Sequence, residues 1–398
     1  MSDVTAPPTT HDAAVAAAGR VARTLATDVV RRDRDGAATV PVEAVAALDR
    51  SGLLAVTVPA ADGGPGLGPR TLAEVIRILA AVDPAIAQIP QAHFLLVDVL
   101  TVLAGGDLRR RIFDDVLAGR RIGNALAERG GRHAQDLSTR VSAGLRLDGR
   151  KYYCTGALTA AWIAASALDA DDRLVLAFVP RDAPGVSVDT DWNVMGQRAT
   201  ISGTTTFAAV AVEPGLLLDY AAAYAVPQQL GARAQLVHAA IEVGIAGGAL
   251  RDTRDYLRER ARPSTEAVRA GATAVADDPH VRHRYGRLAV QVRAAEALLA
   301  DAATVLDEVG LVPADATAAA RGSLAVAGAK AFASEIAVHA GSELFALCGT
   351  SATDERWDLH RHWRNARTHS VHDPVDWKYH HLGAYELGDV LPPNHGQL

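Results

Sequence analysis

Residues 365–378, near the C-terminus, gather the side chains of this chain that are best suited to acid–base chemistry. The segment holds His369 and His372, three residues apart, together with two carboxylates, an arginine, a lysine and a tryptophan, and Pro374 forces a bend beside them. An imidazole titrates near neutral pH and can donate a proton or a hydrogen bond to a bound reactant. This density of functional side chains favours a site over a solvated surface.

Two other interpretations of this segment stay open at the level of sequence. Half of the fourteen histidines lie in the last part of the chain, so a polar, loop-rich C-terminus could collect them on a wet face without any chemistry. A metal site is the second, since His369-x-x-His372-Asp373 has ligand-type residues. No cysteine joins the cluster and the helical His-x-x-x-His spacing is absent, so we predict no metal.

The composition restricts the class of protein. With 398 residues, 49% of them apolar, the chain is long enough for two or three packed domains. The net charge of −6 offers no basic surface for nucleic acid or an anionic membrane. Cys154 and Cys348 form no CxxC motif, which argues against a thiol-redox site. We see no secretion signal and no unbroken apolar run of membrane-spanning length, and expect a soluble cytoplasmic protein.

The spacing of apolar residues divides the chain into three parts. Residues 1–120 show helical spacing, residues 121–220 contain short β-branched segments bounded by Gly, Pro or Asp, and residues 221–398 return to long amphipathic helices. We therefore predict an α+β fold with an N-terminal helical domain, a middle barrel-like β-domain and a C-terminal four-helix bundle with a histidine-rich tail. The expected helices are 11–33, 42–50, 71–81, 85–104, 107–118, 229–260, 279–309 and 315–347, and the expected strand segments are 144–154, 174–179, 185–188 and 204–212.

Several single residues lie where these parts should meet. His93 stands inside the nearly apolar helix 85–104, Asn124 and Thr155 lie near the ends of the early strands, and Trp192 lies in a polar loop. A planar cofactor could be held at such a junction. Each residue also has a structural interpretation: His93 as a satisfied core histidine and Trp192 as a core anchor. Arg262, at a helix end before a proline, is suited to a phosphate but would by default be solvated.

Several sequence strings occur in order over nearly the whole chain: Gln91-Ala92-His93-Phe94, Gly123-Asn124-Ala125, Tyr153-Cys154-Thr155-Gly156-Ala157-Leu158, Asp191-Trp192, Met195-Gly196-Gln197-Arg198, Asp277-Asp278-Pro279, Trp363-Arg364-Asn365-Ala366-Arg367-Thr368-His369 and His372-Asp373-Pro374. They resemble the dibenzothiophene monooxygenase branch of the acyl-CoA dehydrogenase fold, and most closely the bacterial sulfur acquisition oxidoreductase family of flavin monooxygenases. The order of helical domain, β-domain and long-helix bundle agrees with that fold.

This resemblance implies a two-component monooxygenase that depends on reduced flavin, FMNH2, and oxidises a small organosulfur compound with oxygen through a flavin C4a-hydroperoxide. The FMNH2 would come from a separate NAD(P)H-flavin reductase, because no nicotinamide-binding βαβ unit is visible in the chain. The resemblance also implies a homotetramer. The alternatives are an FAD-dependent acyl-CoA dehydrogenase, which needs a carboxylate base, a flavin-dependent N-hydroxylase, and a flavin-binding protein without turnover.

The same resemblance assigns roles to individual residues. His93 and His372 are the catalytic pair, acting as hydrogen-bond donors and proton shuttle near the flavin. Val97 stands where the dibenzothiophene enzymes have a tyrosine, and Thr155 where they have a serine; losing the phenol favours a smaller substrate. The residues expected to bind the cofactor are Asn124 and Thr155 at the isoalloxazine edge, Trp192 at the flavin or substrate side, Arg262 at the FMN phosphate from a neighbouring subunit, Thr350, Ser351 and Thr353 as the phosphate-side loop, and His369 as an orienting residue.

Overall fold

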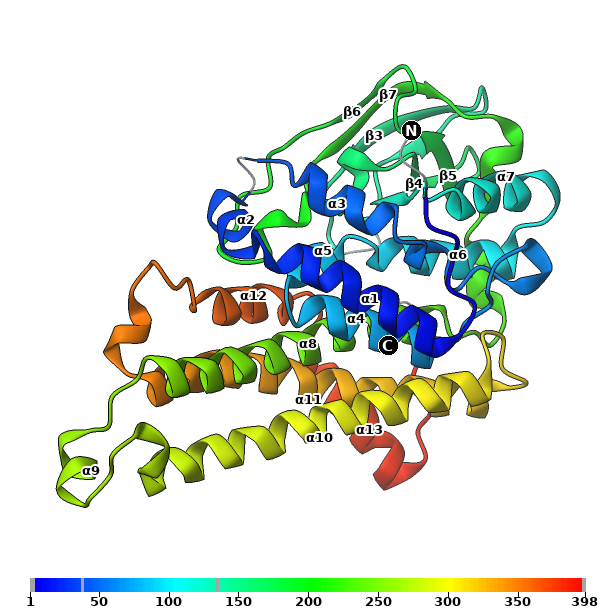
Figure 1. The fold of residues 1–398 in the computed structure, drawn as a ribbon. Coiled ribbons are helices and arrows are strands. Elements are labelled where there is room, and N and C mark those ends of the chain that lie inside the picture. Colours follow the sequence, from blue (N-terminus) through cyan, green and yellow to red (C-terminus); the bar gives the residue numbers. More distant parts are fainter. Residues whose placement is uncertain (1–3, 37–38, 134–135, 396–398) are drawn as a thin grey trace.

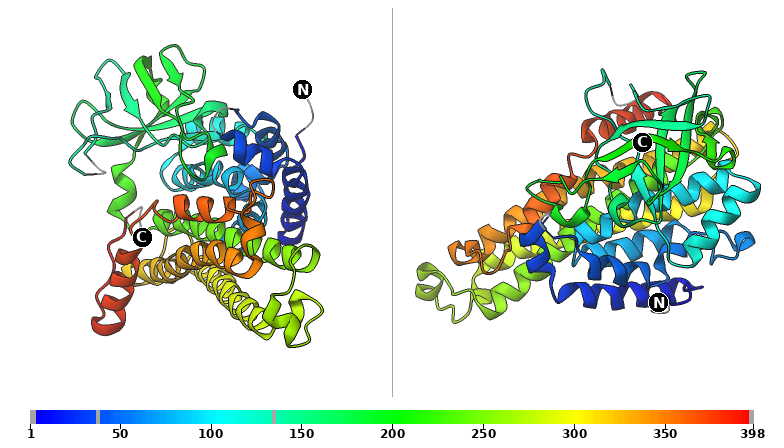
Figure 2. Two further views of the ribbon diagram at one scale, coloured as in Figure 1. Left: turned by 90° about the vertical axis from the view of Figure 1, so that its left-hand side faces the viewer. Right: turned by 90° about the horizontal axis from the view of Figure 1, so that it is seen from above.

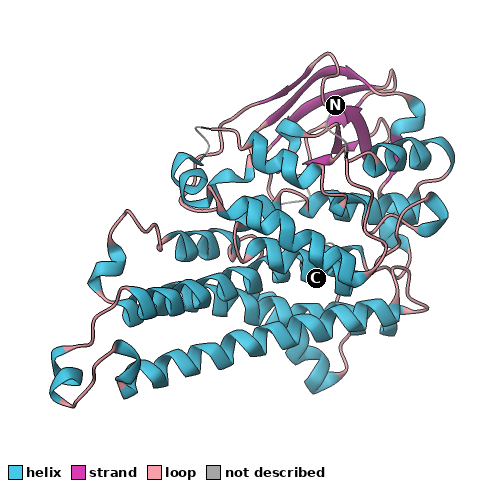
Figure 3. Cartoon of the chain, in the orientation of Figure 1, coloured by secondary structure: helices cyan, strands magenta, loops and turns pink. Residues whose placement is uncertain are grey.

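The computed structural model describes residues 4–36, 39–133 and 136–395, and shows three layers in the predicted order. A curled sheet covers one end, a layer of shorter helices lies in the middle, and long helices form the other end (Figure 1). Figure 3 shows the strands confined to the sheet end. The predicted succession of helical, β and helical parts is confirmed.

In the residues that the structure describes, the N-terminal layer consists of seven α-helices. Two expected helices are each divided into two. The long apolar stretch breaks at Pro90, because proline has no N–H to donate to the carbonyl four residues earlier. The first helix breaks at Thr27 and Asp28. The helices are α1 (His11–Ala26), α2 (Val29–Asp35), α3 (Val42–Asp49), α4 (Pro69–Ala80), α5 (Pro84–Gln88), α6 (Gln91–Leu103) and α7 (Gly106–Leu117).

Helix α6 joins the two main hydrophobic cores. Its Phe94 packs in the core that the N-terminal helices share with the long helices, whereas Leu96 and Val99 pack in the core beneath the sheet. Pro84–Leu103 is also the one stretch of the described residues that is long and apolar enough to cross a membrane, and 67% of its window is buried inside the structure. Helix α6 therefore fixes the position of the sheet on the helical body.

The described residues of the middle part form one eight-stranded sheet with the order β6-β7-β3-β2-β4-β5-β8, and β1 pairs in parallel with β4. No range was predicted for β1, β2, β4 or β8, although the end of an early strand was expected near Asn124. The β4 sequence Trp-Ile-Ala-Ala-Ser-Ala-Leu is rich in alanine and buried on both faces, so it shows neither β-branched enrichment nor alternation. The strands are β1 (Ile122–Ala125), β2 (Arg140–Val141), β3 (Arg146–Lys151), β4 (Trp162–Leu168), β5 (Leu174–Pro180), β6 (Val186–Val188), β7 (Thr205–Ala211) and β8 (Leu217–Asp219).

The C-terminal part contains the three predicted long helices and a helical tail. Helices α8, α10 and α11 lie side by side in both views of Figure 2. Gly244 of α8 approaches α4 so closely that a Cβ there would lie 2.6 Å from the Cβ of Ala80. The possibility of a loop-rich tail is wrong, because α12 and α13 occupy most of it, on either side of Pro374. The helices are α8 (Leu230–Glu259), α9 (Thr265–Arg269), α10 (Pro279–Val309), α11 (Ala316–Cys348), α12 (Arg361–His369) and α13 (Val375–Gly388).

Candidate active site

His93 is fully buried, and backbone groups engage both of its ring nitrogens. Its Nε2 lies 2.9 Å from the carbonyl oxygen of Leu54, and the backbone N–H of Ile122 donates to its Nδ1 at 3.2 Å. These two contacts define a neutral ring protonated on Nε2. Burial lowers the pKa of His93 from 6.5 to about 4, with the Arg121 charge acting in the same direction. The ring thereby holds the first residue of β1, two positions before Asn124.

Asn124 and Thr155 face each other at the end of β1. The backbone N–H of Asn124 donates to the carbonyl oxygen of Thr155 at 3.2 Å, and its side-chain Nδ2 donates to the carbonyl of Tyr153 at 3.3 Å. The hydroxyl of Thr155 lies 2.7 Å from that of Ser202, which in turn lies 2.7 Å from that of Thr200. The structure therefore brings these two predicted residues together in one polar cluster.

Trp192 connects this cluster to the helical tail. Its indole Nε1–H donates to the carbonyl oxygen of Gln197 at 2.9 Å, and its ring meets that of the half-exposed Tyr153 edge-on, with centroids 6.1 Å apart. The backbone N–H of Gln197 donates to Oδ1 of Asn365 at 2.5 Å. Asn365 lies one helical turn before His369 on α12, so the loop of Trp192 is tied to the helix that carries the histidine.

The described part of this junction fits a flavin. Amide and hydroxyl groups at Asn124 and Thr155 supply hydrogen bonds for the polar edge of such a ring, and Tyr153 and Trp192 supply aromatic surface for its planar face. The side-chain amide of Gln197 is buried, and neither its oxygen nor its nitrogen has a hydrogen-bond partner among the described residues. Hydrogen-bonding capacity therefore remains beside Trp192.

His369, at the end of α12, belongs to a buried chain of polar groups. Its Nε2 lies 3.1 Å from Nδ1 of His238, and its Nδ1 lies 3.0 Å from Oε1 of Glu242. Both partners come from α8, one helical turn apart. Because both nitrogens of His369 face these groups, neither is left to bind a metal, which argues against the metal interpretation of this segment.

Glu242 in turn contacts α11. The ammonium of Lys330 donates to its Oε1 at 2.5 Å, and the hydroxyl of Ser334 donates to its Oε2 at 2.7 Å. The side chains of Glu242, Lys330 and His369 are all 0% exposed. Burial alone would raise the pKa of Glu242, but the charge of Lys330 and the contact with His369 outweigh it and lower that pKa. Glu242 is therefore an ionised carboxylate inside the bundle.

His372 lies at the surface end of this chain. Its side chain is 47% exposed, its Nδ1 lies 3.2 Å from Oδ2 of the buried Asp373, and its ring lies against that of His238 with centroids 4.2 Å apart. Burial would raise the pKa of Asp373, but His372 and then Lys378 lower it instead. Asp373 is thus an anion within ion-pair distance of Nδ1 of His372, although its Oδ2 has no hydrogen-bond partner among the described residues. With Nδ1 beside this carboxylate, Nε2 is the nitrogen suited to act on a reactant.

The described contacts do not bring His93 and His372 together as a pair. The partners of His93 are backbone groups of Leu54 and Ile122, whereas the ring contact of His372 is with His238. The role of His93 as a proton shuttle stays a prediction. Its contacts support a different task, the placement of β1.

The remaining predicted residues lie elsewhere on the bundle. The turn that joins α8 to α9 carries Arg262 and lies at the far end of the long helices from the sheet (Figure 1). Thr350, Ser351 and Thr353 follow α11, and the hydroxyl of Ser351 accepts from that of Tyr256 at 2.9 Å, near the end of α8. A single copy of the chain therefore does not place these residues beside Asn124 and Thr155.

Sequence reasoning missed His238, Glu242 and Lys330. A signal for them existed. The chain has three lysines, Lys151, Lys330 and Lys378, and all three are buried. A lysine inside an alanine-rich helix requires an acidic partner, and Glu242 on the apolar face of another helix was the available one.

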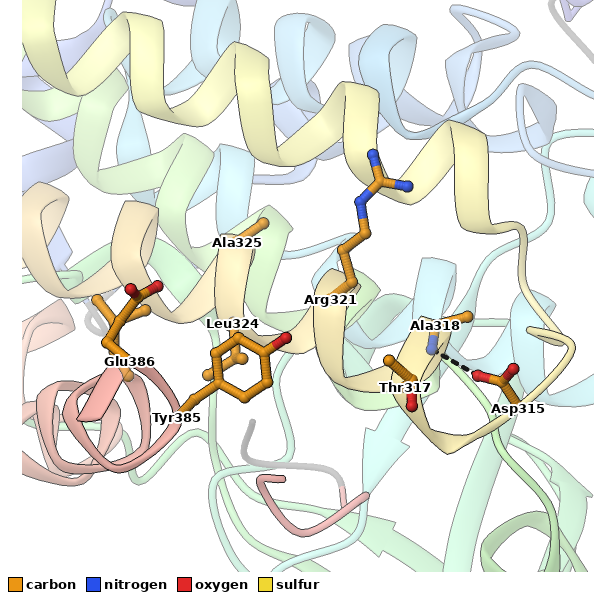
Figure 4. A pocket seen from close by; sticks show the side chains of 9 residues that line it. Asp315, Thr317, Ala318, Arg321, Leu324, Ala325, Tyr385 and Glu386 are labelled. Atoms are coloured by element: carbon orange, nitrogen blue, oxygen red, sulfur yellow. Dashed lines mark hydrogen bonds between the residues drawn. The ribbon is translucent and has the colours of Figure 1, made fainter. Parts of the chain in front are cut away.

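A groove of about 540 Å³ between the start of α11 and α13 lies apart from these residues (Figure 4). Arg321, Tyr385 and Glu386 are among its lining residues, and Asp315 caps α11 there through the backbone N–H of Ala318. None of the predicted site residues lines this groove. We therefore place the candidate site at the junction of the sheet and α12.

Comparison with known proteins identifies the family. The family model described as the acyl-CoA dehydrogenase N-terminal domain matches residues 9–120, and the model described as the acyl-CoA dehydrogenase C-terminal domain matches residues 236–377. The probable FMNH2-dependent monooxygenase SfnC of Pseudomonas putida is 34% identical over 95% of this chain and 96% of its own length.

Two solved structures show the same relationship. Methanesulfinate monooxygenase MsuC from Pseudomonas fluorescens is 31% identical, with a TM-score of 0.89, and the match covers 96% of this chain and 99% of that one. The FMN-bound TdsC from Paenibacillus sp. A11-2 is 28% identical, with a TM-score of 0.90, over 97% of this chain and 100% of that one. The chain belongs to the flavin-dependent monooxygenases that have the acyl-CoA dehydrogenase fold, in the branch of the dibenzothiophene monooxygenases.

Proposed function

We propose that this protein is a two-component monooxygenase that uses FMNH2 and oxygen to oxidise a small organosulfur compound. The observation that carries the proposal is His372, whose Nδ1 faces the buried Asp373 so that its Nε2 is left for a reactant. The names of the relatives support FMN as the cofactor and sulfur compounds as substrates. The alternatives, an FAD-dependent acyl-CoA dehydrogenase and an N-hydroxylase, are not favoured by these relatives.

The residues at the junction would hold the cofactor and control water. Asn124 and Thr155 would hydrogen-bond the polar edge of the ring system, and Trp192 would cover one side. Bound FMNH2 supplies the two electrons that oxygen needs, so that one oxygen atom reaches sulfur and the other leaves as water. His372 would give the proton for that water from Nε2 and recover it from solvent. Excluding bulk water at this step prevents loss of the oxidant.

His93 would act by holding β1 in place, and His369 would act by orienting its neighbours. The contacts of His93 with Leu54 and Ile122 fix the start of β1, and Asn124 follows in the same strand. A shift of β1 would move the amide of Asn124 away from the cofactor edge. We therefore propose that replacing His93 lowers the rate of oxygenation because Asn124 is then displaced.

Arg262, Thr350, Ser351 and Thr353, here called the distant group, would complete the site of another subunit. Arg262 makes no hydrogen bond or ion pair with the residues that the structure describes, and a free guanidinium suits a phosphate. We propose a homotetramer in which Arg262, with Thr350, Ser351 and Thr353, binds the FMN phosphate of a neighbouring subunit. This arrangement explains why one copy separates these residues from Asn124.

The substrate would be small, and the reductant would come from a partner. Val97 is fully buried in the core beneath the sheet, and a valine has no phenol for a polar contact with a tricyclic substrate. We propose a separate NAD(P)H-flavin reductase as the source of FMNH2, and a cytoplasmic location where both components meet.

The test is a stopped-flow experiment in which anaerobically reduced FMN and the protein are mixed with oxygen. Flavin reoxidation that is slower than for free FMN, and that accelerates when a small sulfinate, sulfide or sulfone is added, supports the proposal. His372→Gln should reduce product per flavin oxidised and increase hydrogen peroxide. Reoxidation at the rate of free FMN, with no product from any of these compounds, would refute it.

A further inference from the structure

The buried chain Lys330, Glu242, His369 and His238 ends against the ring of His372. Its successive contacts are Nζ to Oε1 at 2.5 Å, Oε1 to Nδ1 at 3.0 Å and Nε2 to Nδ1 at 3.1 Å, and the last step is the ring contact at 4.2 Å. The chain crosses from α11 to α8 to α12 and returns to α8. Such a chain inside an alanine-rich bundle has a desolvation cost that a purely apolar core would avoid.

The contacts determine where each proton lies. The ionised carboxylate of Glu242 accepts hydrogen bonds, so His369 must carry its proton on Nδ1. The Nε2 of a neutral His369 is then an acceptor, and His238 must donate to it from Nδ1. His238 therefore has its proton directed away from His372, and the tautomers of both rings follow from the position of one carboxylate.

Burial favours the uncharged form of the two inner rings, although Glu242 alone would raise the pKa of His369. Burial lowers the pKa of His238 and of His369, and for His238 the neighbouring His372 and His369 act in the same direction. Two imidazoles whose ring centroids lie 4.2 Å apart do not both carry a positive charge at low cost, because like charges repel.

We infer that His238 is a positioning residue for His372, that Glu242, acting through His369, directs the proton of His238 to Nδ1, and that the charges of Glu242 and Lys330 together act on the proton of His372. The inference rests on the proposed function for its consequence in catalysis, but its structural content does not require flavin. It gives a role to a buried ion pair that the binding of a cofactor leaves unexplained.

The charged and titratable groups that face this pair of rings come from four elements and one loop. Glu242 lies on α8 with His238, Lys330 lies on α11, His369 ends α12, Asp373 lies in the loop after it, and Lys378 lies on α13. Asp373 contacts His372 directly, so it must be left intact in any test of the more distant pair. Glu242 and Lys330 can be replaced without altering Asp373 or His372.

Glu242→Gln removes one negative charge and keeps an oxygen that accepts from His369 and Lys330. The charge of Lys330 is then uncompensated. At roughly 10 Å and an effective dielectric constant of about 20, one unit charge moves a titration by about one pH unit. We expect His372 to lose its proton at a pH about one unit lower in Glu242→Gln. The double variant Glu242→Gln/Lys330→Met has neither charge and should return the titration to its original pH.

The experiment is a pH titration of nitrogen-15 histidine-labelled, flavin-free protein by NMR, with the ring signals of His238 and His372 assigned from His238→Phe and His372→Gln. We expect His238 to carry its proton on Nδ1 near neutral pH, and His372 to shift down in the single variant and back in the double variant. Glu343→Gln, which breaks a surface pair with Arg284 on the same bundle, is the matched control and should shift neither ring.

Two results would overturn the inference: His238 protonated on Nε2 or on both nitrogens near neutral pH, or a His372 titration that is the same in wild type and Glu242→Gln. Because the protein contains no flavin in this titration, its outcome does not depend on monooxygenase activity. With flavin present, the pH above which product formation falls should move with the titration of His372. The expected NMR result without oxygenation would contradict only the proposed function.

Discussion

Replacing His93 with glutamine should change how stability depends on pH. The ring is fully buried and makes one hydrogen bond to Leu54 and one to Ile122. Glutamine can keep one of these bonds but not both, so a buried backbone group loses its partner. We expect His93→Gln to lower the free energy of unfolding by about 2 kcal/mol near neutral pH, the typical cost of an unsatisfied buried group.

The pH dependence follows from the pKa of His93, which is lowered from 6.5 to about 4 in the folded protein. A histidine with a lowered pKa favours the folded state fully above about pH 6.5, and that contribution is lost as the pH falls toward 4, because the unfolded chain binds the proton first. Between about pH 7.5 and about pH 5 this linkage removes about 2 kcal/mol from the wild type. The variant has no such group to titrate. The two proteins should therefore differ clearly near neutral pH and be nearly equal near pH 5.

The assay is urea unfolding of both proteins at the two pH values and at one protein concentration. His280→Gln, which alters an exposed imidazole at the start of α10, is the control and should leave the wild-type pH dependence unchanged. A stability difference between wild type and His93→Gln that is the same at both pH values would show that His93 is not held neutral by its burial, and the reasoning would be refuted.

Three further predictions concern the junction and the distant group. Trp192→Leu removes the aromatic contact with Tyr153 and the proposed aromatic cover on one side of the flavin. A loss of about 1.4 kcal/mol of stacking with the flavin should weaken FMNH2 binding by about tenfold, measured as the dissociation constant under anaerobic conditions. Arg364→Met breaks the bond from Arg364 to the carbonyl of Met195 at 2.9 Å and removes the guanidinium that pairs with the buried carboxylates of Asp33 and Asp358. We therefore expect a loss of about 3 kcal/mol in urea unfolding, with Arg364→Lys restoring only part of it. Arg262→Ala should leave the unfolding free energy within about 0.5 kcal/mol and raise the FMN dissociation constant; unchanged FMN binding would contradict the proposed phosphate contact.

The sequence was sufficient for elements whose pattern is strong and local. The apolar periodicity of residues 279–309 predicted helix α10 with the bounds that the structure has, and the β-branched segments predicted β5 and β7. Strand β4 escaped prediction because alanine carries no preference for a sheet, and its burial on both faces depends on helices that lie elsewhere in the chain. The helices of the tail escaped prediction because polar histidine and arginine obscure the apolar spacing of α12.

The same difference between local patterns and long-range contacts holds for the candidate site. Asn124, Thr155 and Trp192 were predicted from resemblance, and the structure places them at one junction. The contact between His238 and His369 joins residues 131 positions apart, and no local pattern encodes such a pairing. The same holds for Glu242 and Lys330, where the three buried lysines gave the composition-level signal. Resemblance also could not show that backbone groups engage both nitrogens of His93.

The central claim is that this protein inserts one atom of molecular oxygen into a small organosulfur compound. The most direct measurement supplies FMNH2 from a flavin reductase under oxygen-18 gas, with methanesulfinate as the first substrate and small sulfides and sulfones as the next, and reads the product by mass spectrometry. The account predicts a product that carries one oxygen-18 atom, formed faster with the wild type than with His372→Gln. A product whose added oxygen comes from labelled water, or flavin oxidation that yields only hydrogen peroxide with every substrate, would contradict it.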